Sequence, residues 1–356
     1  MIRLYIIFII AAIIIALVVK LLLSVFHFLD DDKPISDVLI VAGAELILAN
    51  ISSFSDKVIQ FLYTLLRLPE PLSESSIQPG WLLGFGAVML ILGIIVKMID
   101  SSIPYVILNM PGTIHHTKDD GMQKSLNATK CEEIEVSTAG SQSEMQKLPQ
   151  SKLNGILKDI ELQMNRFNRE KGKKRCFTGM APIPFIIYAG TKHEGNDINH
   201  YIEFDKSTQK YVKLNNDKSY PQLIVPKTDC SSSVSEIVVS VSTTARITEA
   251  DTKQFNLPIL NITLDKPKDN AIFSKKQLND YVNRTVTAIS ELCKNNDITT
   301  IHLLLATQPC FAYALGKSFI TMQNRIPQII SYHYIAPSYS VGIIVNGKSR
   351  GNIVRP

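Results

Sequence analysis

The stretch Ile301-His-Leu-Leu-Leu-Ala-Thr-Gln-Pro309 decides the fold class of the second part of this chain. Ile301–Ala306 is an apolar run of strand length, Thr307 and Gln308 make a short turn, and a helix is expected from Pro309 to Met322. Proline suits the first helical turn, where its missing N–H would be unpaired anyway. The free N–H groups and dipole of such a helix favour an anion above the carboxyl end of the strand. A plain strand-to-helix crossover has the same spacing, so both interpretations remain open.

Strands and helices alternate on both sides of this unit. The periodicity predicts helices over Leu153–Phe167 and over the face that runs from Leu278 to Cys293. Apolar or alternating runs predict strands at Pro184–Tyr188, Tyr201–Phe204, Tyr211–Leu214, Ile237–Ser242, Ile259–Leu264, Gln328–Ile335 and Val341–Val345. The alternation predicts an α/β sheet domain covered by helices.

The first 102 residues differ from the rest in their long apolar runs. The runs at about 4–28 and 80–99 predict two transmembrane α-helices, which makes 1–102 a membrane module with an acidic loop over 30–80. That loop carries eight acids against three bases, so the positive-inside rule places it outside and both termini in the cytoplasm. The apolar part of the loop, 38–68, is expected to be interfacial or re-entrant, and a further span is the alternative.

Charge and cysteine content describe the remaining part. Residues 1–100 hold six Lys or Arg and nine acids, a net −3, so the total of +5 leaves +8 for 101–356. A basic domain suits an anionic ligand or an anionic membrane surface. The five cysteines are widely spaced and contain no CxxC pair, which favours reduced thiols in a cytosolic domain over disulfides or zinc. Residues 103–174 are expected to form a linker and a helix that lead into a domain over 175–356.

One motif match is rejected on its context. Gly342-Ile-Ile-Val-Asn-Gly-Lys-Ser349 fits the spacing of a phosphate-binding loop. That loop needs a flexible glycine-rich segment followed by a helix, whereas this segment has a strand-like interior and only seven residues after Ser349. Asn346-Gly347 is instead the favoured centre of a two-residue hairpin turn.

Other polar clusters are candidates for ligand contacts. Ser240, Ser242, Thr243 and Thr244 gather hydroxyls at the end of a predicted strand, where they either surround phosphates or cap the next element. Tyrosines of the last strands either stack on bases or pack against the sheet. The adjacent His115 and His116 have no further ligand at metal-site spacing. No GxSxG, HExxH or GxGxxG motif is present, so no catalytic residue, metal or cofactor is predicted.

Several blocks together resemble the SAVED family, the cyclic-oligonucleotide sensor domain of CBASS antiphage effectors. The resemblance covers roughly 175–350, about half of the chain, and rests on the order and spacing of the blocks. They are Gly179-Met-Ala-Pro-Ile-Pro-Phe-Ile-Ile-Tyr-Ala-Gly190, Tyr201-Ile-Glu-Phe-Asp205, Glu236-Ile-Val-Val-Ser-Val-Ser242, Ile301 to Pro309 with Leu315-Gly316, and Tyr332-His-Tyr334. Thr307 and Gln308 stand where the family has smaller residues before the proline, which leaves the base preference open.

The resemblance implies a soluble domain of two fused CARF-like Rossmannoid halves. It implies a cyclic oligonucleotide ligand, most simply a cyclic trinucleotide, made by a partner nucleotidyltransferase of the CD-NTase class, with no DNA or RNA polymer as partner. The residues then expected to bind the ligand are Pro182, Pro184, Tyr188, Ser240, Ser242, Thr243, Thr307, Gln308, Pro309, Phe311, Lys317, Tyr332 and Tyr334.

The expected function is that of an antiphage effector without enzymatic activity. Ligand binding makes the SAVED units self-associate, and the gathered membrane module then disrupts the bacterial inner membrane. Gly84, Gly86 and Gly93 favour close approach of spans. One alternative is a membrane-anchored enzyme that degrades the same nucleotide, similar to a ring nuclease, and another is a scaffold without ligand.

Overall fold

A computed structural model describes residues 36–47, 81–112, 125–126, 130–138, 142–195, 197–215, 218–226, 234–322 and 326–356. The chain divides into two compact units, Met1–Ser102 and Ile103–Pro356. The predicted span at 4–28 and most of the acidic loop lie outside the described residues.

Two helices of the first unit pack closely through glycines. One covers residues 36–47, and the other is α3 (Trp81–Ser102). A Cβ added at Gly86 would lie 3.0 Å from the carbonyl oxygen of Gly43. A Cβ added at Gly93 would lie 2.9 Å from a backbone nitrogen of the facing helix. Two of the glycines predicted to allow contacts between spans are therefore used inside this unit.

The side of α3 away from this contact is apolar. Side chains between 38% and 67% exposed lie along it, at Val88, Ile91, Leu92, Ile94, Ile95, Val96 and Met98. Lys97 pairs with Asp37 at 2.9 Å. Among the described ranges, no helix proves long and apolar enough to cross a membrane. The predicted span 80–99 is thus confirmed as a helix but not supported as a membrane span.

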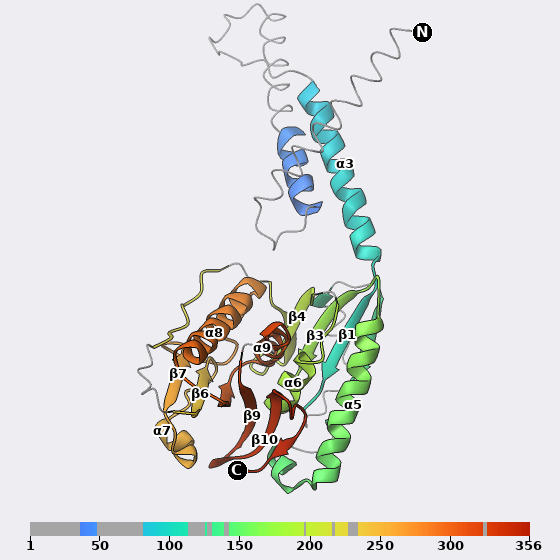
Figure 1. Ribbon diagram of the computed structural model, residues 1–356. Helices are drawn as coiled ribbons and strands as arrows, with labels where there is room; N and C mark the ends of the chain where they lie inside the picture. Colours follow the sequence, from blue (N-terminus) through green and yellow to red (C-terminus); the bar gives the residue numbers. More distant parts are fainter. Residues whose placement is uncertain are drawn as a thin grey trace, which may run out of the picture. The chain divides into compact units, whose positions relative to one another are not determined.

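The 103–356 unit contains two mixed sheets with the same strand pattern (Figure 1). In the first sheet, four parallel strands are followed by one antiparallel strand, in the order β2-β1-β3-β4-β5. Its strands are β1 (Tyr105–Met110), β2 (Cys131–Glu135), β3 (Lys174–Gly179), β4 (His200–Asp205) and β5 (Lys210–Lys213).

The second sheet repeats this order and adds one strand, as β7-β6-β8-β9-β10-β11. Strands β6 to β9 are parallel, and β10 and β11 are antiparallel to their neighbours. The strands are β6 (Glu236–Ser242), β7 (Ile259–Thr263), β8 (Thr300–Ala306), β9 (Gln328–Ile335), β10 (Ser338–Asn346) and β11 (Ile353–Val354).

The helices repeat as well. An amphipathic helix, α5 (Gln150–Arg169) or α8 (Lys275–Asn295), precedes the third strand of each half, and α6 (Ile183–Gly190) or α9 (Pro309–Met322) follows it. The shorter elements η1 (Gln142–Lys147), α7 (Glu249–Thr252) and η2 (Lys253–Phe255) complete the list. We call residues 103–215 the first half and 234–356 the second half.

Helices α6 and α9 cross in the middle of the unit, between the two sheets (Figure 1). Each packs against the other half's sheet, α6 on β9 and β10 and α9 on β3 and β4. Glycine allows this crossing, because a Cβ at Gly190 would overlap the carbonyl oxygen of Tyr313 and one at Gly316 would overlap that of Ile187. The two halves therefore share one continuous hydrophobic core.

Most predicted elements are confirmed, and the exceptions have physical causes. Pro184–Tyr188 is not a strand but the centre of α6, since a short run buried on all sides has no periodicity to reveal its type. Residues 103–174, predicted as a linker and a helix, also supply β1 and β2 to the first sheet. The hairpin after Asn346 is present, but its loop is longer than two residues, with Gly347 at a φ of 108°.

Candidate functional site

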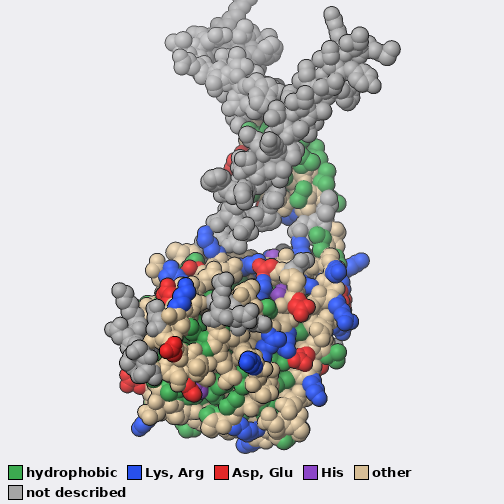
Figure 2. Space-filling model, in the orientation of Figure 1, with side chains coloured by type: hydrophobic (Ala, Val, Ile, Leu, Met, Phe, Trp, Pro, Cys, Tyr) green, Lys and Arg blue, Asp and Glu red, His purple; other side chains and the backbone are tan. Residues whose placement is uncertain are grey.

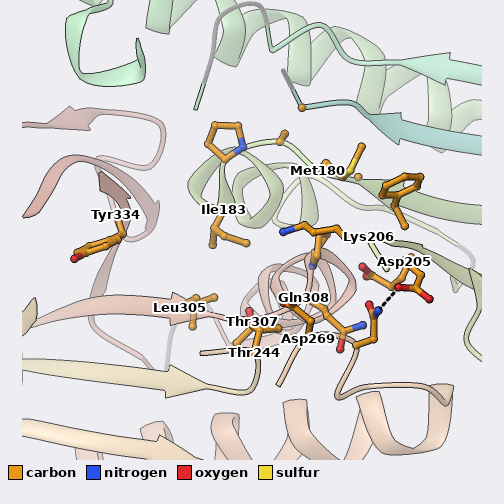
Figure 3. Close-up of a pocket in the computed structure, with 18 of the residues that line it drawn as sticks. Met180, Ile183, Asp205, Lys206, Thr244, Asp269, Leu305, Thr307, Gln308 and Tyr334 are labelled. Carbon is orange, nitrogen blue, oxygen red and sulfur yellow. Dashed lines mark hydrogen bonds between the residues drawn. The ribbon is translucent and has the colours of Figure 1, made fainter. Parts of the chain in front are cut away.

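A cavity of about 530 Å³ lies where the carboxyl ends of β3, β4, β6 and β8 meet (Figure 3). The loops after these strands and the first turns of α6 and α9 line it. Both halves contribute, so the cavity is the meeting point of two equivalent strand-to-helix crossovers. Its volume lies in the range of about 300–1,000 Å³ that is typical of small-molecule sites.

The first turn of α9 is not an open anion site. Pro309 has no N–H, the amide of Cys310 donates to Oε1 of Glu203 at 2.7 Å, and the amides of Phe311 and Ala312 donate to the carbonyl of Gln308. Glu203, from β4 of the other half, thus supplies the hydrogen-bond acceptor for the open donor of this helix. The expectation that the donors of this helix are free for a ligand is wrong for this reason.

The first turn of α6 is open instead. Pro182 is its N-cap, Pro184 has no N–H, and the amide of Phe185 donates to the carbonyl of Pro182. Among the residues that the structure describes, no partner is found for the amide of Ile183, which lines the cavity. This amide is a donor available to an anion at the positive end of the helix.

Lys206 is the basic side chain beside this donor. It follows β4, is exposed and reaches over the cavity (Figure 3). Within the described part of the chain its ammonium group makes no ion pair, whereas Lys317 pairs with Asp197 away from the cavity. Lys206, rather than the predicted Lys317, is therefore placed to contact a phosphate in this cavity.

Carboxylates line the cavity near Lys206. Oδ1 of Asp205 accepts hydrogen bonds from Ser207 and from Nδ2 of Asn270, the latter at 2.8 Å (Figure 3). Hydrogen bonds from Ser207 and Thr208 lower the pKa of Asp205 to about 2, so it is ionised at neutral pH. Asp269 follows β7 and lines the same region. The cavity therefore has an acidic region, although the 101–356 segment as a whole is basic.

Thr307 and Gln308 both line the cavity, in different roles. Thr307 is 8% exposed, and its buried hydroxyl has no hydrogen-bond partner among the residues that the structure describes. Gln308 is held by two bonds to the backbone of Ile272, one accepted at 2.6 Å and one donated at 3.0 Å. The Thr307 hydroxyl is thus enclosed, and the Gln308 amide ties α9 to the loop before α8.

The two predicted tyrosines reach the cavity from β9. The hydroxyl of Tyr332 contacts Nδ1 of His302 at 3.0 Å, and that of Tyr334 donates to Asp251 at 2.9 Å. Tyr334 is 42% exposed and stands at one end of the cavity (Figure 3), so its ring is open to stacking.

The remaining predicted residues lie outside the cavity lining. Pro184 and Phe311 are buried. Tyr188 is buried too, and its hydroxyl donates to Oε1 of Glu161 at 2.6 Å. The hydroxyl of Ser240 bonds Asn261, and that of Ser242 accepts the amide of Ile247. Thr243 is buried, with a hydroxyl that has no partner. Of the thirteen predicted residues, the cavity brings together Pro182, Thr307, Gln308, Pro309, Tyr332 and Tyr334.

Sequence analysis missed most of the polar lining. Glu203 sits in an alternating strand, where a carboxylate is expected to face solvent, and it is 6% exposed. Lys206, Asp269 and Asn270 lie in turns without a motif of their own. One signal in the sequence could have found these three residues, because each of them follows a parallel strand. The carboxyl ends of parallel strands gather at one edge of a sheet.

The matching family agrees with this architecture. The profile of the SAVED domain, described as "SMODS-associated and fused to various effectors sensor domain", matches residues 160–345, more than half of the chain. The chain therefore belongs to the SAVED family of sensor domains. The predicted fold of an α/β domain made of two CARF-like halves is confirmed at this level. No curated protein matches the chain.

Similar solved structures are Cap4 receptors that contain SAVED/CARF domains. The Acinetobacter baumannii receptor with the cyclic trinucleotide 2′3′3′-cAAA has 13% identity and a TM-score of 0.50, over 74% of this chain and 56% of that one. The same receptor with 3′3′3′-cAAA has 12% identity and a TM-score of 0.48, over 88% and 79%. The Moraxella osloensis receptor has 14% identity and a TM-score of 0.45, over 71% and 52%. The chain thus spans about half the length of two of these proteins.

Proposed function

We propose that the 103–356 unit is a sensor that binds a cyclic oligonucleotide, most simply a cyclic trinucleotide, in the cavity between its two halves. The observation that carries the proposal is the cavity at the carboxyl ends of strands from both sheets, with the amide of Ile183 and the ammonium of Lys206 as donors beside it. Family membership and the cyclic trinucleotides bound by the Cap4 receptors support this ligand class.

Calorimetry on the full chain in detergent micelles tests this proposal. We expect one binder in a panel of cyclic di-, tri- and tetranucleotides. Lys206→Glu is expected to weaken binding about tenfold or more, because a charge-assisted contact to phosphate contributes about 1.5–3 kcal/mol. Lys210→Glu is the matched control, since this exposed lysine makes the same charge change outside the cavity lining. A panel without any binder, on chain shown to be folded, contradicts the proposal.

The proposed output is disruption of the inner membrane by the 1–102 unit after the sensors self-associate. The apolar runs of the sequence and the exposed apolar residues of α3 support a role at the membrane (Figure 2). Tethering raises the local concentration of these units once sensors associate. Because Gly86 and Gly93 are already packed, contacts between chains would use the exposed residues and Gly84, where an added Cβ meets nothing within 4 Å.

Dye release from liposomes carrying the full chain tests this output. Dye release that requires the cyclic nucleotide, and that is lost in the double variant Ile91→Asp with Ile95→Asp, supports this output. Glu45→Gln, on the exposed side of the other helix, is the control. Ligand-dependent oligomers that leave the dye inside contradict it.

We further propose a multi-pass inner-membrane protein with both termini and the sensor in the cytoplasm, working with a CD-NTase that makes the ligand. A cysteine at Ser53 should react with an impermeant thiol reagent in intact cells, and Cys293 should not.

We also propose that the protein is not an enzyme. The alternative, a ring-nuclease-like activity, is favoured only by Glu203, Lys206 and His333 lining one cavity, and ligand recovered intact after incubation would exclude it.

A further inference from the structure

Glu203 is a buried carboxylate without a cationic partner. It is 6% exposed, and its hydrogen bonds come from one residue, Cys310, through the amide at 2.7 Å and through the thiol. No Lys or Arg pairs with it within the described ranges. Burial raises the pKa of Glu203 to about 7. Buried carboxylates are normally paired, because removing their charge from water is expensive, and an exception beside a cavity is a candidate functional group.

Other carboxylates lie near Glu203 in the cavity lining. Asp205 and Asp269 line the same region of the cavity, and Asp205 is ionised. Figure 3 places these two acids toward one end and Tyr334 toward the other. A carboxylate has about four acceptor positions, so Glu203 retains acceptor capacity beyond its two bonds to Cys310. Thr307 lines the cavity as well, and its buried hydroxyl has no hydrogen-bond partner among the described residues.

A nucleotide presents two kinds of polar edge, and only one of them fits this region. Its phosphates are acceptors with negative charge, which the carboxylates repel, whereas Lys206 and the amide of Ile183 attract them. An exocyclic amino group on a base is a neutral donor, and a carboxylate is the stronger kind of acceptor for it. A phosphate is therefore expected at Lys206 and the amide of Ile183, and an exocyclic amino group at the carboxylate of Glu203.

We infer that Glu203, with Asp269, selects a base that carries an exocyclic amino group, and so determines which cyclic oligonucleotides bind. The inference rests on the proposed function, which supplies the ligand class. It deepens that function by assigning Glu203 and Asp269 to base selection.

Two matched ligands test the inference: cyclic triadenylate, and the same ring built from unsubstituted purine, which lacks only the amino groups. Wild-type chain should bind the amino-bearing ring about tenfold more tightly or better, as expected for a good polar contact to a base edge. In Glu203→Gln this preference should fall, while the side-chain carbonyl still accepts the amide of Cys310. Asp269→Asn, in an exposed loop, gives a second variant that leaves the core intact.

Proton release gives an independent measure. A donor bound to Glu203 favours its ionised form, so binding near pH 7 should release a proton, measured by calorimetry in buffers of different ionisation enthalpy. Asp205, Lys206, Asp269, His333 and Cys310 are the other titratable groups around it, and Glu203→Gln separates its contribution from theirs. Equal affinity for the two rings overturns the inference and leaves the proposed function standing. Absence of binding by both rings overturns the inference, and absence of any binder in the whole panel overturns the proposed function itself.

Discussion

The two halves of the 103–356 unit share a strand order but treat their helix N-termini differently. In the second half, the first turn of α9 is occupied by Glu203, which comes from β4 of the first half. In the first half, the first turn of α6 retains the amide of Ile183 as a donor beside Lys206. One duplicated crossover therefore serves as a structural joint between the halves, and its counterpart is left for a ligand.

Strands β4 and β9 differ in the side chains near their carboxyl ends. Phe177 of β3 pairs with Tyr201 of β4, and Leu304 of β8 pairs with Tyr332 of β9. Two residues farther along, β4 carries Glu203 and β9 carries Tyr334. Glu203 turns inward to cap the other half's helix, whereas Tyr334 stays 42% exposed and donates to Asp251. Tyr201 belongs to the core shared by the two halves and Tyr332 to a separate cluster, so Glu203 and Tyr334, two residues farther along, face different sides of their sheets.

A substitution that forces the crossing helices α6 and α9 apart should have the largest effect. Gly316→Ala places a methyl group on the carbonyl oxygen of Ile187. This oxygen belongs to the backbone of α6, so it cannot move away as the end of a flexible side chain could. We expect the free energy of unfolding to fall by about 3 kcal/mol or more, as for severe overpacking, measured by urea titration. Gly155→Ala is the control, since its Cβ meets nothing within 4 Å in α5, and it should be neutral or stabilising by up to about 1 kcal/mol. Equal stability of wild type and Gly316→Ala would show that the helices do not cross this closely.

The second largest effect should come from the ionisation of Glu203, measured as the pH dependence of stability. Between the ordinary carboxyl value and its pKa of about 7, the folded chain holds a proton that the unfolded chain has lost. Stability therefore falls as pH rises through this window. Glu203→Gln should remove this loss, and so stabilise the chain at pH 8 by about 2–3 kcal/mol relative to wild type, with much less difference at pH 5. A stability difference that does not change between pH 5 and pH 8 would contradict the account.

A smaller effect should follow from making the two helix starts alike. Ile183→Pro gives α6 the same first residue as α9 and removes the open amide, at a position where proline is tolerated. We expect stability to change little and affinity for the cyclic nucleotide to fall about tenfold, the value of one hydrogen bond to a charged group. Ile183→Ala keeps the amide and removes the side chain, so its affinity should stay closer to wild type. The reverse order of the two affinities would assign the effect to packing.

The sequence predicts the second half better than the first. The apolar runs of β6, β7 and β8 and the proline that opens α9 are all visible in order, because strand and helix periodicities change clearly there. In the first half, α6 is too short and too completely buried to show a hydrophobic period. Only two residues separate the end of α3 from the start of β1. Local patterns do not resolve such elements.

The candidate site is less predictable than the fold, for a different reason. Prolines and tyrosines at strand ends are recognisable, and six of the predicted residues do line the cavity. Glu203 and Lys206 become visible only when two crossovers from distant parts of the sequence meet. Conversely, Ser242 and Lys317 look like ligands in the sequence, but Ser242 supports a turn and Lys317 pairs with Asp197.

Hydrogen exchange of the full chain, with and without a cyclic trinucleotide, tests most directly whether one ligand bridges both halves. The account predicts simultaneous protection of the loops that follow β3 and β4 in the first half and β8 in the second, with Lys206→Glu reducing protection in both. Protection confined to one half, or absent at saturating ligand, would contradict it.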